Sequence, residues 1–398
     1  MENFFQSKLQ TLSRHLFDSY DSFKINEIES CHFTQMEMLK WFWPFEEQKL
    51  FVKTVLGTSA EGRSISLYSM GDGLMKVMLW SQMHGDEPTA TMALADVFSF
   101  FAKNPEHEVT KAISKKLTLL VISMLNPDGA ERFTRRTAQL IDMNRDALAL
   151  ETPEAKILKT VRDKYHPEYG FNLHDQDSRL TVGTTKKITA IALLAPSTNE
   201  LRTDNLVRVR AKKTGSTFAQ VLNQFIPGHL AKWDDTFEPR AFGDNMQKWG
   251  TSTILVESGG WRGDPNKFYI RKLNCIALLA TLYAIAIGEN ANADIAVYEE
   301  IPFNMKLGCD IILHNAMFKA NDRTAPVRVD VGINIDKHKN YETGQIESFA
   351  VIVDIGDLSN FTALEEDVDV HGAVLDTSRI KLDHPFSENE LALLMKRT

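Results

Sequence analysis

The sequence Met83-His84-Gly85-Asp86-Glu87-Pro88 stands between a strand-like run, residues 74–82, and a helical run, residues 88–101. An imidazole and a carboxylate three residues apart, at the carboxyl end of a strand, are able to turn toward one divalent cation. A His-x-x-Glu pair arises roughly once by chance in a chain of this composition, so a surface histidine near a helix start is the competing interpretation. Residues farther along the chain decide between the two.

The runs around this stretch alternate between strand and helix. Residues 51–56 and 64–70 are typical of strands joined by a glycine-containing turn, and residues 117–125 form an almost unbroken apolar run before Asn126-Pro127-Asp128-Gly129. The alternation predicts an α/β domain with a central mixed, largely parallel sheet, helices on both faces and a site at the strand ends. Further strands are expected at residues 170–174, 188–194 and 251–257, and further helices at 205–225 and 271–288.

The hydrophobic pattern of the sequence is different at both ends of the chain. In residues 1–45, apolar residues recur every three or four positions, which predicts short helices packed on the main domain. Alternating valines and isoleucines between 327 and 335 indicate β-structure near the other end. We therefore expect a helical segment (1–45), a main catalytic domain (46–290) and a small β-rich domain (291–398). The isolated histidines of the last part are expected to be surface or structural residues, namely His314, His338, His371 and His384.

The composition excludes several classes of protein. With 43% apolar and 25% charged residues among 398, the chain is an ordinary soluble globular protein. The net charge is −8 with acids and bases interleaved, so no basic surface for nucleic acid is expected. Three distant cysteines predict neither a disulfide framework nor a cysteine metal site. The start of the chain does not resemble a leader and no run of about 18 apolar residues follows, so we expect a cytoplasmic protein without a membrane partner. The oligomeric state stays open.

A third histidine strengthens the metal interpretation. A catalytic zinc takes three protein ligands and keeps one position open, and two histidines with one glutamate are a known ligand set. His174 is the best partner for His84 and Glu87, because it ends the short apolar run 171–174 and is followed by polar residues. The long gap between Glu87 and His174 fits ligands from different strands of one sheet. We predict one Zn²⁺ per chain.

A candidate base and a group of cations accompany these ligands. Glu257 ends the apolar run 253–256, where burial would raise the pKa of its carboxyl toward the working range. The alternative is a glutamate in a salt bridge at a strand end. Arginine binds carboxylates in a bidentate manner and stabilises oxyanions, so cations near zinc indicate a substrate with a free carboxylate. The polar cluster after residue 126 consists of Arg132, Arg135, Arg136, Asn144 and Arg145.

Together these motifs resemble the zinc carboxypeptidases of the carboxypeptidase A type, the M14 metallopeptidase family. The resemblance covers about residues 50–288. It rests on the stretch from Gly57 to Ile65, His84-x-x-Glu87, Asn126-Pro127-Asp128-Gly129, Thr134-Arg135-Arg136, Asp142-Met143-Asn144-Arg145-Asp146, His174 and Glu257.

The resemblance implies roles for the residues of the metal group. His84, Glu87 and His174 would bind zinc, and Glu257 would act as the general base and then as the proton donor. Asp142 would hold His84 in one tautomer and orientation, as metal-bound histidines generally require.

The resemblance also implies a set of substrate contacts. Arg135 would polarise the scissile carbonyl. Asn144 and Arg145 would hold the C-terminal carboxylate of the substrate, and Arg136 would also bind the substrate. One departure concerns the mobile tyrosine that family members carry ahead of the catalytic glutamate, because the matching loop, residues 242–250, contains no tyrosine.

The sequence therefore predicts a zinc metallocarboxypeptidase that acts on a peptide or an acylated amino acid with a free carboxylate. Two other enzymes that use the same mechanism remain as alternatives. They are an amidase of bacterial cell-wall peptides and a deacylase of N-acyl amino acids. The alternative from another class is a non-catalytic binding protein that has kept the fold.

Overall fold

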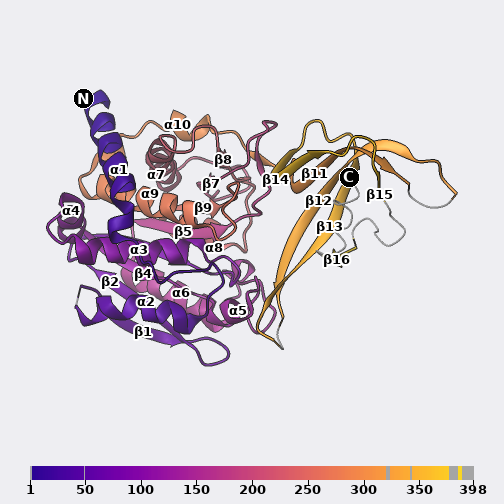
Figure 1. Cartoon of the computed structure of the whole chain (residues 1–398). Helices are drawn as coiled ribbons and strands as arrows, with labels where there is room; N and C mark the ends of the chain where they lie inside the picture. The colour runs from indigo at the N-terminus through magenta and orange to yellow at the C-terminus, as the bar shows by residue number, and fades with distance from the viewer. Residues whose placement is uncertain (1, 49, 320–322, 341–342, 376–383, 388–398) are drawn as a thin grey trace.

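The computed structural model describes residues 2–48, 50–319, 323–340, 343–375 and 384–387 (Figure 1). Its central element is a sheet of eight described strands in the order β1-β2-β4-β3-β5-β9-β7-β8. The central strands β4, β3, β5 and β9 are parallel to one another, and antiparallel pairs occur toward both edges. The expected mixed, largely parallel sheet is confirmed. The strands are β1 (Val52–Thr58), β2 (Ser64–Met70), β3 (Met75–Ser81), β4 (Leu117–Ile122), β5 (Tyr169–Asp175), β7 (Ile191–Leu194), β8 (Leu230–Lys232) and β9 (Ser252–Ser258).

Helices cover both faces of this sheet. Successive side chains of a strand point to opposite faces, so β3 sends Val77 and Leu79 into one core and Met78 and Trp80 into another. The second core packs against α6 (Pro153–Tyr165) and α8 (Phe242–Lys248). The first and larger core packs against α1 (Glu2–Phe23), α2 (Gln35–Glu47), α3 (Thr89–Lys103), α4 (Glu108–Lys116), α7 (Leu206–Leu222) and α9 (Phe268–Ala286).

Helix α9 lies at the centre of the larger core, and every residue from Leu273 to Ala286 is buried. Among the described residues it is the one helix that is long and apolar enough to cross a membrane, and 83% of its most apolar window is buried inside the protein. A helix that is apolar on all sides is typical of the interior of a large domain.

The N-terminal segment differs from the short helices expected, because α1 is one helix of 22 residues. The apolar spacing continues past Leu16 to Tyr20 and Phe23, which are both buried, so the helix continues to present an apolar face as far as Phe23. A buried ion pair fixes its end. Arg271 of α9 donates to both carboxylate oxygens of Asp96 on α3, at 2.6 and 2.7 Å, and the Tyr20 hydroxyl donates to the same carboxylate.

The last part of the chain forms a second sheet, here called the C-terminal sheet, in the order β14-β11-β12-β13-β16 with β15 beside β11. β12 contains the alternating run, residues 327–335, that predicted β-structure. Charged residues interrupt the pattern of β11 and β14, which were not predicted. The β-rich character is confirmed. The domain boundaries at residues 45 and 290 stay predictions. The strands are β11 (Gly308–Phe318), β12 (Val327–Lys339), β13 (Ile346–Gly356), β14 (Thr362–Asp369), β15 (Val374–Leu375) and β16 (Phe386–Ser387).

Polar contacts join the C-terminal sheet to the main domain. Arg179, in the segment after β5, donates to Asp336 on β12 at 2.8 Å and to Asp310 on β11 at 3.3 Å. The Lys339 ammonium donates to the carbonyl of Glu131 on α5 (Pro127–Arg132) at 2.6 Å. The long strands β12 and β13 accordingly reach down toward α5 (Figure 1). The C-terminal sheet therefore flanks the edge of the main sheet at which β5 ends.

Candidate metal centre and active site

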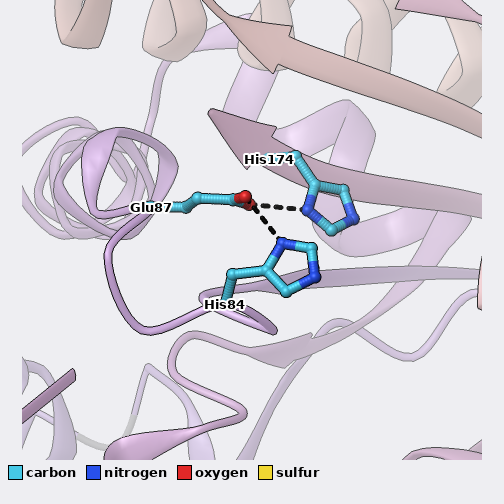
Figure 2. Close-up of side chains that lie close together, drawn as sticks. All are labelled: His84, Glu87 and His174. Atoms are coloured by element: carbon cyan, nitrogen blue, oxygen red, sulfur yellow. Dashed lines mark hydrogen bonds and ion pairs between the residues drawn. The ribbon is translucent and has the colours of Figure 1, made fainter. Parts of the chain in front are cut away.

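Three side chains from distant parts of the chain meet at the carboxyl ends of β3 and β5 (Figure 2). His84 and Glu87 lie in the loop between β3 and α3, and His174 lies on β5. Their ligand atoms are all within 4.8 Å of one another. All three are buried, with exposed fractions of 1%, 6% and 2%. The structure thus brings together the three residues predicted as metal ligands.

The sheet explains why these residues converge. β3 and β5 are parallel neighbours with Ser81 opposite Leu173, so the residues that follow β3 emerge beside His174. The chain turns sharply at Gln82, whose φ is +47°. Gly85 then packs so closely against α5 that a Cβ atom would lie 2.0 Å from the carbonyl carbon of Gly129. The His-Gly-Asp-Glu loop therefore needs both its own glycine and the Asn-Pro-Asp-Gly turn beside it.

Both imidazoles turn Nδ1 toward the carboxylate of Glu87. His84 Nδ1 lies 2.6 Å from one oxygen and His174 Nδ1 lies 2.6 Å from the other. On the far side of the first ring, His84 Nε2 lies 3.1 Å from Asp142 Oδ1. His174 Nε2 is buried and has no hydrogen-bond partner in the part of the chain that the structure describes. The two Nδ1 atoms and the carboxylate form one convergent donor set.

This donor set fits a zinc ion. Zinc bonds of about 2.0–2.1 Å in tetrahedral geometry separate neighbouring ligand atoms by roughly 3.3 Å, so an ion would lengthen the two nitrogen–oxygen contacts of 2.6 Å by less than about 1 Å. Two nitrogen donors and one carboxylate match a catalytic set, and they leave one coordination position for water or substrate.

Protons balance the buried charges when no ion is bound. Burial lowers the pKa of His84, but the negative charge of Glu87 and the hydrogen bonds with Asp142 and Glu87 outweigh it and raise this pKa to about 9. Burial raises the pKa of Glu87, and the two imidazoles outweigh burial and hold it far below its usual range. Burial keeps the pKa of His174 below its ordinary value. A proton on His84 and a metal ion therefore compete for the same nitrogen.

Glu257 lies beside the metal group, opposite His174 in the register of β5 and β9. It is 9% exposed, and its Oε2 has no hydrogen-bond partner among the described residues. Burial, together with the negative charge of Glu87, raises the pKa of the Glu257 carboxyl well above its ordinary value. A carboxyl group with a raised pKa beside a metal group has the properties of a general base.

The predicted arginine cluster is divided in the structure. Arg135 donates to Asp142 Oδ2 at 3.1 Å and to Glu87 Oε1 at 3.3 Å. Arg136 donates to the carbonyl of Leu140 in its own loop, and Arg132 pairs with Glu61 on the other side of that loop. Of these three arginines, Arg135 contacts the metal group, whereas Arg132 and Arg136 do not have such contacts among the described residues.

Asn144 and Arg145 belong to a short 3-10 helix, η1 (Met143–Arg145), that follows Asp142. The Asn144 side chain accepts a hydrogen bond from the backbone N–H of Phe242 at 2.9 Å. Arg145 is exposed, donates to the carbonyl of Asn144 at 2.8 Å and lies 3.3 Å from the carboxylate of Glu238. Asp142 therefore connects the metal group to this helix, because it caps η1 and also contacts His84.

The segment expected to be the mobile loop, residues 242–250, is instead largely the helix α8. Its residues from Phe242 to Gln247 are all buried, and Phe242 and Met246 belong to the second core. The apolar spacing of Phe242, Met246 and Trp249 could have revealed this helix. The half-exposed segment before it, which carries Glu238, was missed by the sequence analysis.

A cleft of about 560 Å³ opens from the metal group. Glu87 and Arg135 line it on the side of the main domain, together with Asp175. The C-terminal sheet contributes Asp336 and Lys337 to the opposite wall. No sequence signal pointed to these wall residues, because they gain their position only when the two sheets pack together.

Comparisons with known proteins agree with this geometry. Residues 44–175 match the family model described as zinc carboxypeptidase, a range that contains His84, Glu87 and His174. Carboxypeptidase 2 of Trichophyton rubrum is 26% identical over 245 residues, which are 61% of this chain and 43% of that protein. Probable carboxypeptidase 2 of Arthroderma benhamiae is 27% identical over 163 residues, which are 40% of this chain and 30% of that protein. The chain spans less than half the length of these curated relatives.

Solved structures show the same fold at lower identity. A metallo-carboxypeptidase from Burkholderia cenocepacia has a TM-score of 0.51 and 15% identity, and covers 66% of this chain and 70% of its own. Bovine thrombin-activatable fibrinolysis inhibitor has a TM-score of 0.50 and 13% identity. The match covers 66% of this chain and 98% of that one. The carboxypeptidase A-like fold of the main domain is confirmed.

The resemblance to the M14 zinc carboxypeptidases, a family of zinc-dependent hydrolases, is confirmed by these matches. The expected cytoplasmic location is wrong, because the fungal carboxypeptidases that the chain resembles are secreted enzymes.

Proposed function

We propose that this chain is a zinc-dependent metallocarboxypeptidase that hydrolyses the C-terminal peptide bond of peptides. The observation that carries the proposal is the convergence of His84, Glu87 and His174, with the buried carboxyl of Glu257 beside them on the neighbouring strand. The family match and the fold of the main domain support it.

One zinc ion per chain would be held by His84 Nδ1, the Glu87 carboxylate and His174 Nδ1. When bound, it supplies a Lewis acid that polarises a carbonyl and lowers the pKa of water. Asp142 holds the His84 ring through Nε2, so that Nδ1 stays directed inward.

Glu257 is the general base of the proposed reaction. Its carboxylate accepts a proton from the attacking water while the water oxygen bonds to the scissile carbonyl carbon. The same carboxyl then delivers the proton to the leaving nitrogen as the carbon–nitrogen bond breaks. The raised pKa of Glu257 suits both halves of this transfer.

Arginines orient the substrate in this proposal. Arg135 is 44% exposed at its side chain, and it turns toward the oxygen of the scissile carbonyl by leaving Asp142 and Glu87. Asn144 and Arg145 bind the C-terminal carboxylate of the substrate. Arg136 lies farther out on the same loop and contributes positive charge.

The test compares Glu257→Gln and Arg145→Ala with the wild type on a peptide library that varies at its free C-terminus, read by mass spectrometry and by zinc analysis. We expect Glu257→Gln to keep zinc and lose hydrolysis by at least about 10²-fold. Arg145→Ala should weaken free-acid peptides and spare amidated ones. Equal effects of Arg145→Ala on both kinds of peptide would contradict the exopeptidase assignment. Release of acyl fragments would favour a deacylase, and release of cell-wall fragments would favour an amidase.

A further inference from the structure

The carboxylate of Glu238 lies between two guanidinium groups. Arg240 donates to it through Nε at 2.9 Å and through Nη2 at 2.8 Å. Arg145 approaches the same carboxylate from the other side, with Nε 3.3 Å from Oε2. Hydrogen bonds from Arg240 and the charges of Arg240 and Arg145 lower the pKa of Glu238 to about 2, so this carboxylate is ionised at neutral pH.

Local contacts hold Glu238 in this position. It lies in the segment between β8 and α8, where its backbone N–H donates to Asp244 Oδ1 at 3.2 Å. The carbonyl of Arg240 accepts from the backbone N–H of Ala147, which follows η1, at 3.1 Å. The segment that carries Glu238 is therefore attached to the one that carries Arg145.

Two of the three guanidinium nitrogens of Arg145 are engaged in this arrangement. Nε faces Glu238, and Nη1 donates to the carbonyl of Asn144 at 2.8 Å. A carboxylate binds an arginine best through two parallel hydrogen bonds along one edge of the guanidinium. The edge that includes Nε becomes available to a substrate only when the carboxylate of Glu238 moves away.

We propose that Glu238 is an internal competitor for the C-terminal carboxylate of the substrate, and that binding along the Nε edge of Arg145 requires its displacement. When the Glu238 carboxylate leaves Arg145, it keeps its two hydrogen bonds with Arg240. Glu238 thereby sets the affinity for free-acid substrates. This inference rests on the proposed function, because it takes Arg145 as the residue that binds that carboxylate.

The expected change in the Kd of the substrate follows from the solvent exposure of the Arg145–Glu238 ion pair. The side chains of Arg145 and Glu238 are 38% and 29% exposed, so water and salt screen their attraction. Pairs of this kind contribute little to stability, and loss of the competitor should tighten binding about two- to five-fold. The opposite hypothesis, in which Glu238 orients Arg145 for the substrate, predicts weaker binding after the same substitution.

The experiment measures binding without turnover. In the zinc-loaded Glu257→Gln protein, the Kd of N-acetyl-alanyl-phenylalanine and of its amide is determined by calorimetry with and without Glu238→Gln. We expect Glu238→Gln to lower the Kd of the free acid about two- to five-fold and to leave that of the amide unchanged. Glu200→Gln, which removes one charge from an exposed position, is the matched control and should change neither.

Two further readouts decide the outcome. In an Arg145→Ala background, Glu238→Gln should no longer change the Kd of the free acid. An unchanged or increased Kd in the first comparison, or a decrease that persists without Arg145, would overturn the inference. Hydrolysis by the wild type is measured separately. Absence of hydrolysis would refute the proposed function, whereas the role of Glu238 is determined from the Kd values alone.

Discussion

At the scale of single residues, the side chain behind His84 decides which of its ring nitrogens is turned inward. Asp142 lies behind His84 and contacts its Nε2, whereas the Nε2 of His174 is buried without a partner among the described residues. The hydrogen bond with His84 and the charges of His84 and Arg135 outweigh burial and hold the pKa of Asp142 below its ordinary value, so Asp142 accepts as a carboxylate. A single acid thus orients one ligand and also caps η1.

Asp142→Asn tests this orienting contact. The amide keeps the shape of the carboxylate but loses its charge, and partners of this kind typically change metal affinity about 10–100-fold. We expect zinc affinity, measured by competition with a chelator, to fall by that factor. Asp72→Asn, at an exposed position in a turn, is the control and should leave zinc affinity unchanged.

The pKa of His84 predicts how the stability of the metal-free protein depends on pH. This pKa is raised from 6.5 to about 9 by folding, so the protonated ring stabilises the folded metal-free protein fully below about pH 6.5. That contribution is lost as the pH rises through about 9. Thermal unfolding of chelator-treated protein should show Tm falling across this window, and zinc should remove the His84 component because the ion replaces the proton. A flat Tm of the metal-free protein would contradict the assignment.

At the scale of elements, the strand ends were predictable because hydrophobic patterns mark buried parallel strands. β3, β5 and β9 lie within a few residues of their predicted ranges, and their carboxyl ends meet at one edge of the sheet. Helix α8 and the full length of α1 were not predicted. In α8, glycine and several polar residues obscure the helical spacing of Phe242, Met246 and Trp249.

Gly85→Ala tests the loop that presents two of the ligands. Its Cβ would overlap the backbone of Gly129, and relief of the overlap would shift His84 and Glu87. We expect the unfolding free energy to fall by about 1–3 kcal/mol or more, together with reduced zinc content. Gly356→Ala on β13 meets no atom within 4 Å and is the control. Normal zinc content and stability of Gly85→Ala would show that the loop tolerates movement.

At the scale of the whole molecule, the cleft beside the metal group is lined by residues of the main domain and of the C-terminal sheet. The segment after His174 carries Arg179, which is bound to two carboxylates of the C-terminal sheet. The main domain and its metal group could be predicted from motifs that are local in sequence. The wall formed by Asp336 and Lys337 and the position of Glu238 depend on long-range packing, which leaves no local pattern.

Arg179→Ala tests whether the C-terminal sheet is held by this contact. The Arg179 side chain is 18% exposed and its partner Asp310 is 11% exposed, so the loss of charged hydrogen bonds should cost about 1–3 kcal/mol. We expect faster hydrogen exchange in β11 and β12 and a changed KM. Arg202→Ala removes an arginine that is 46% exposed and paired with Asp235, and as the control it should cost at most about 1 kcal/mol.

The central claim is that one zinc ion is held by three side chains from two neighbouring strand ends. Anomalous diffraction at the zinc edge from crystals of the wild-type protein tests it most directly. The account predicts a single strong peak about 2.0–2.2 Å from His84 Nδ1, a Glu87 carboxylate oxygen and His174 Nδ1. A peak at another place, or coordination through either Nε2, would contradict it.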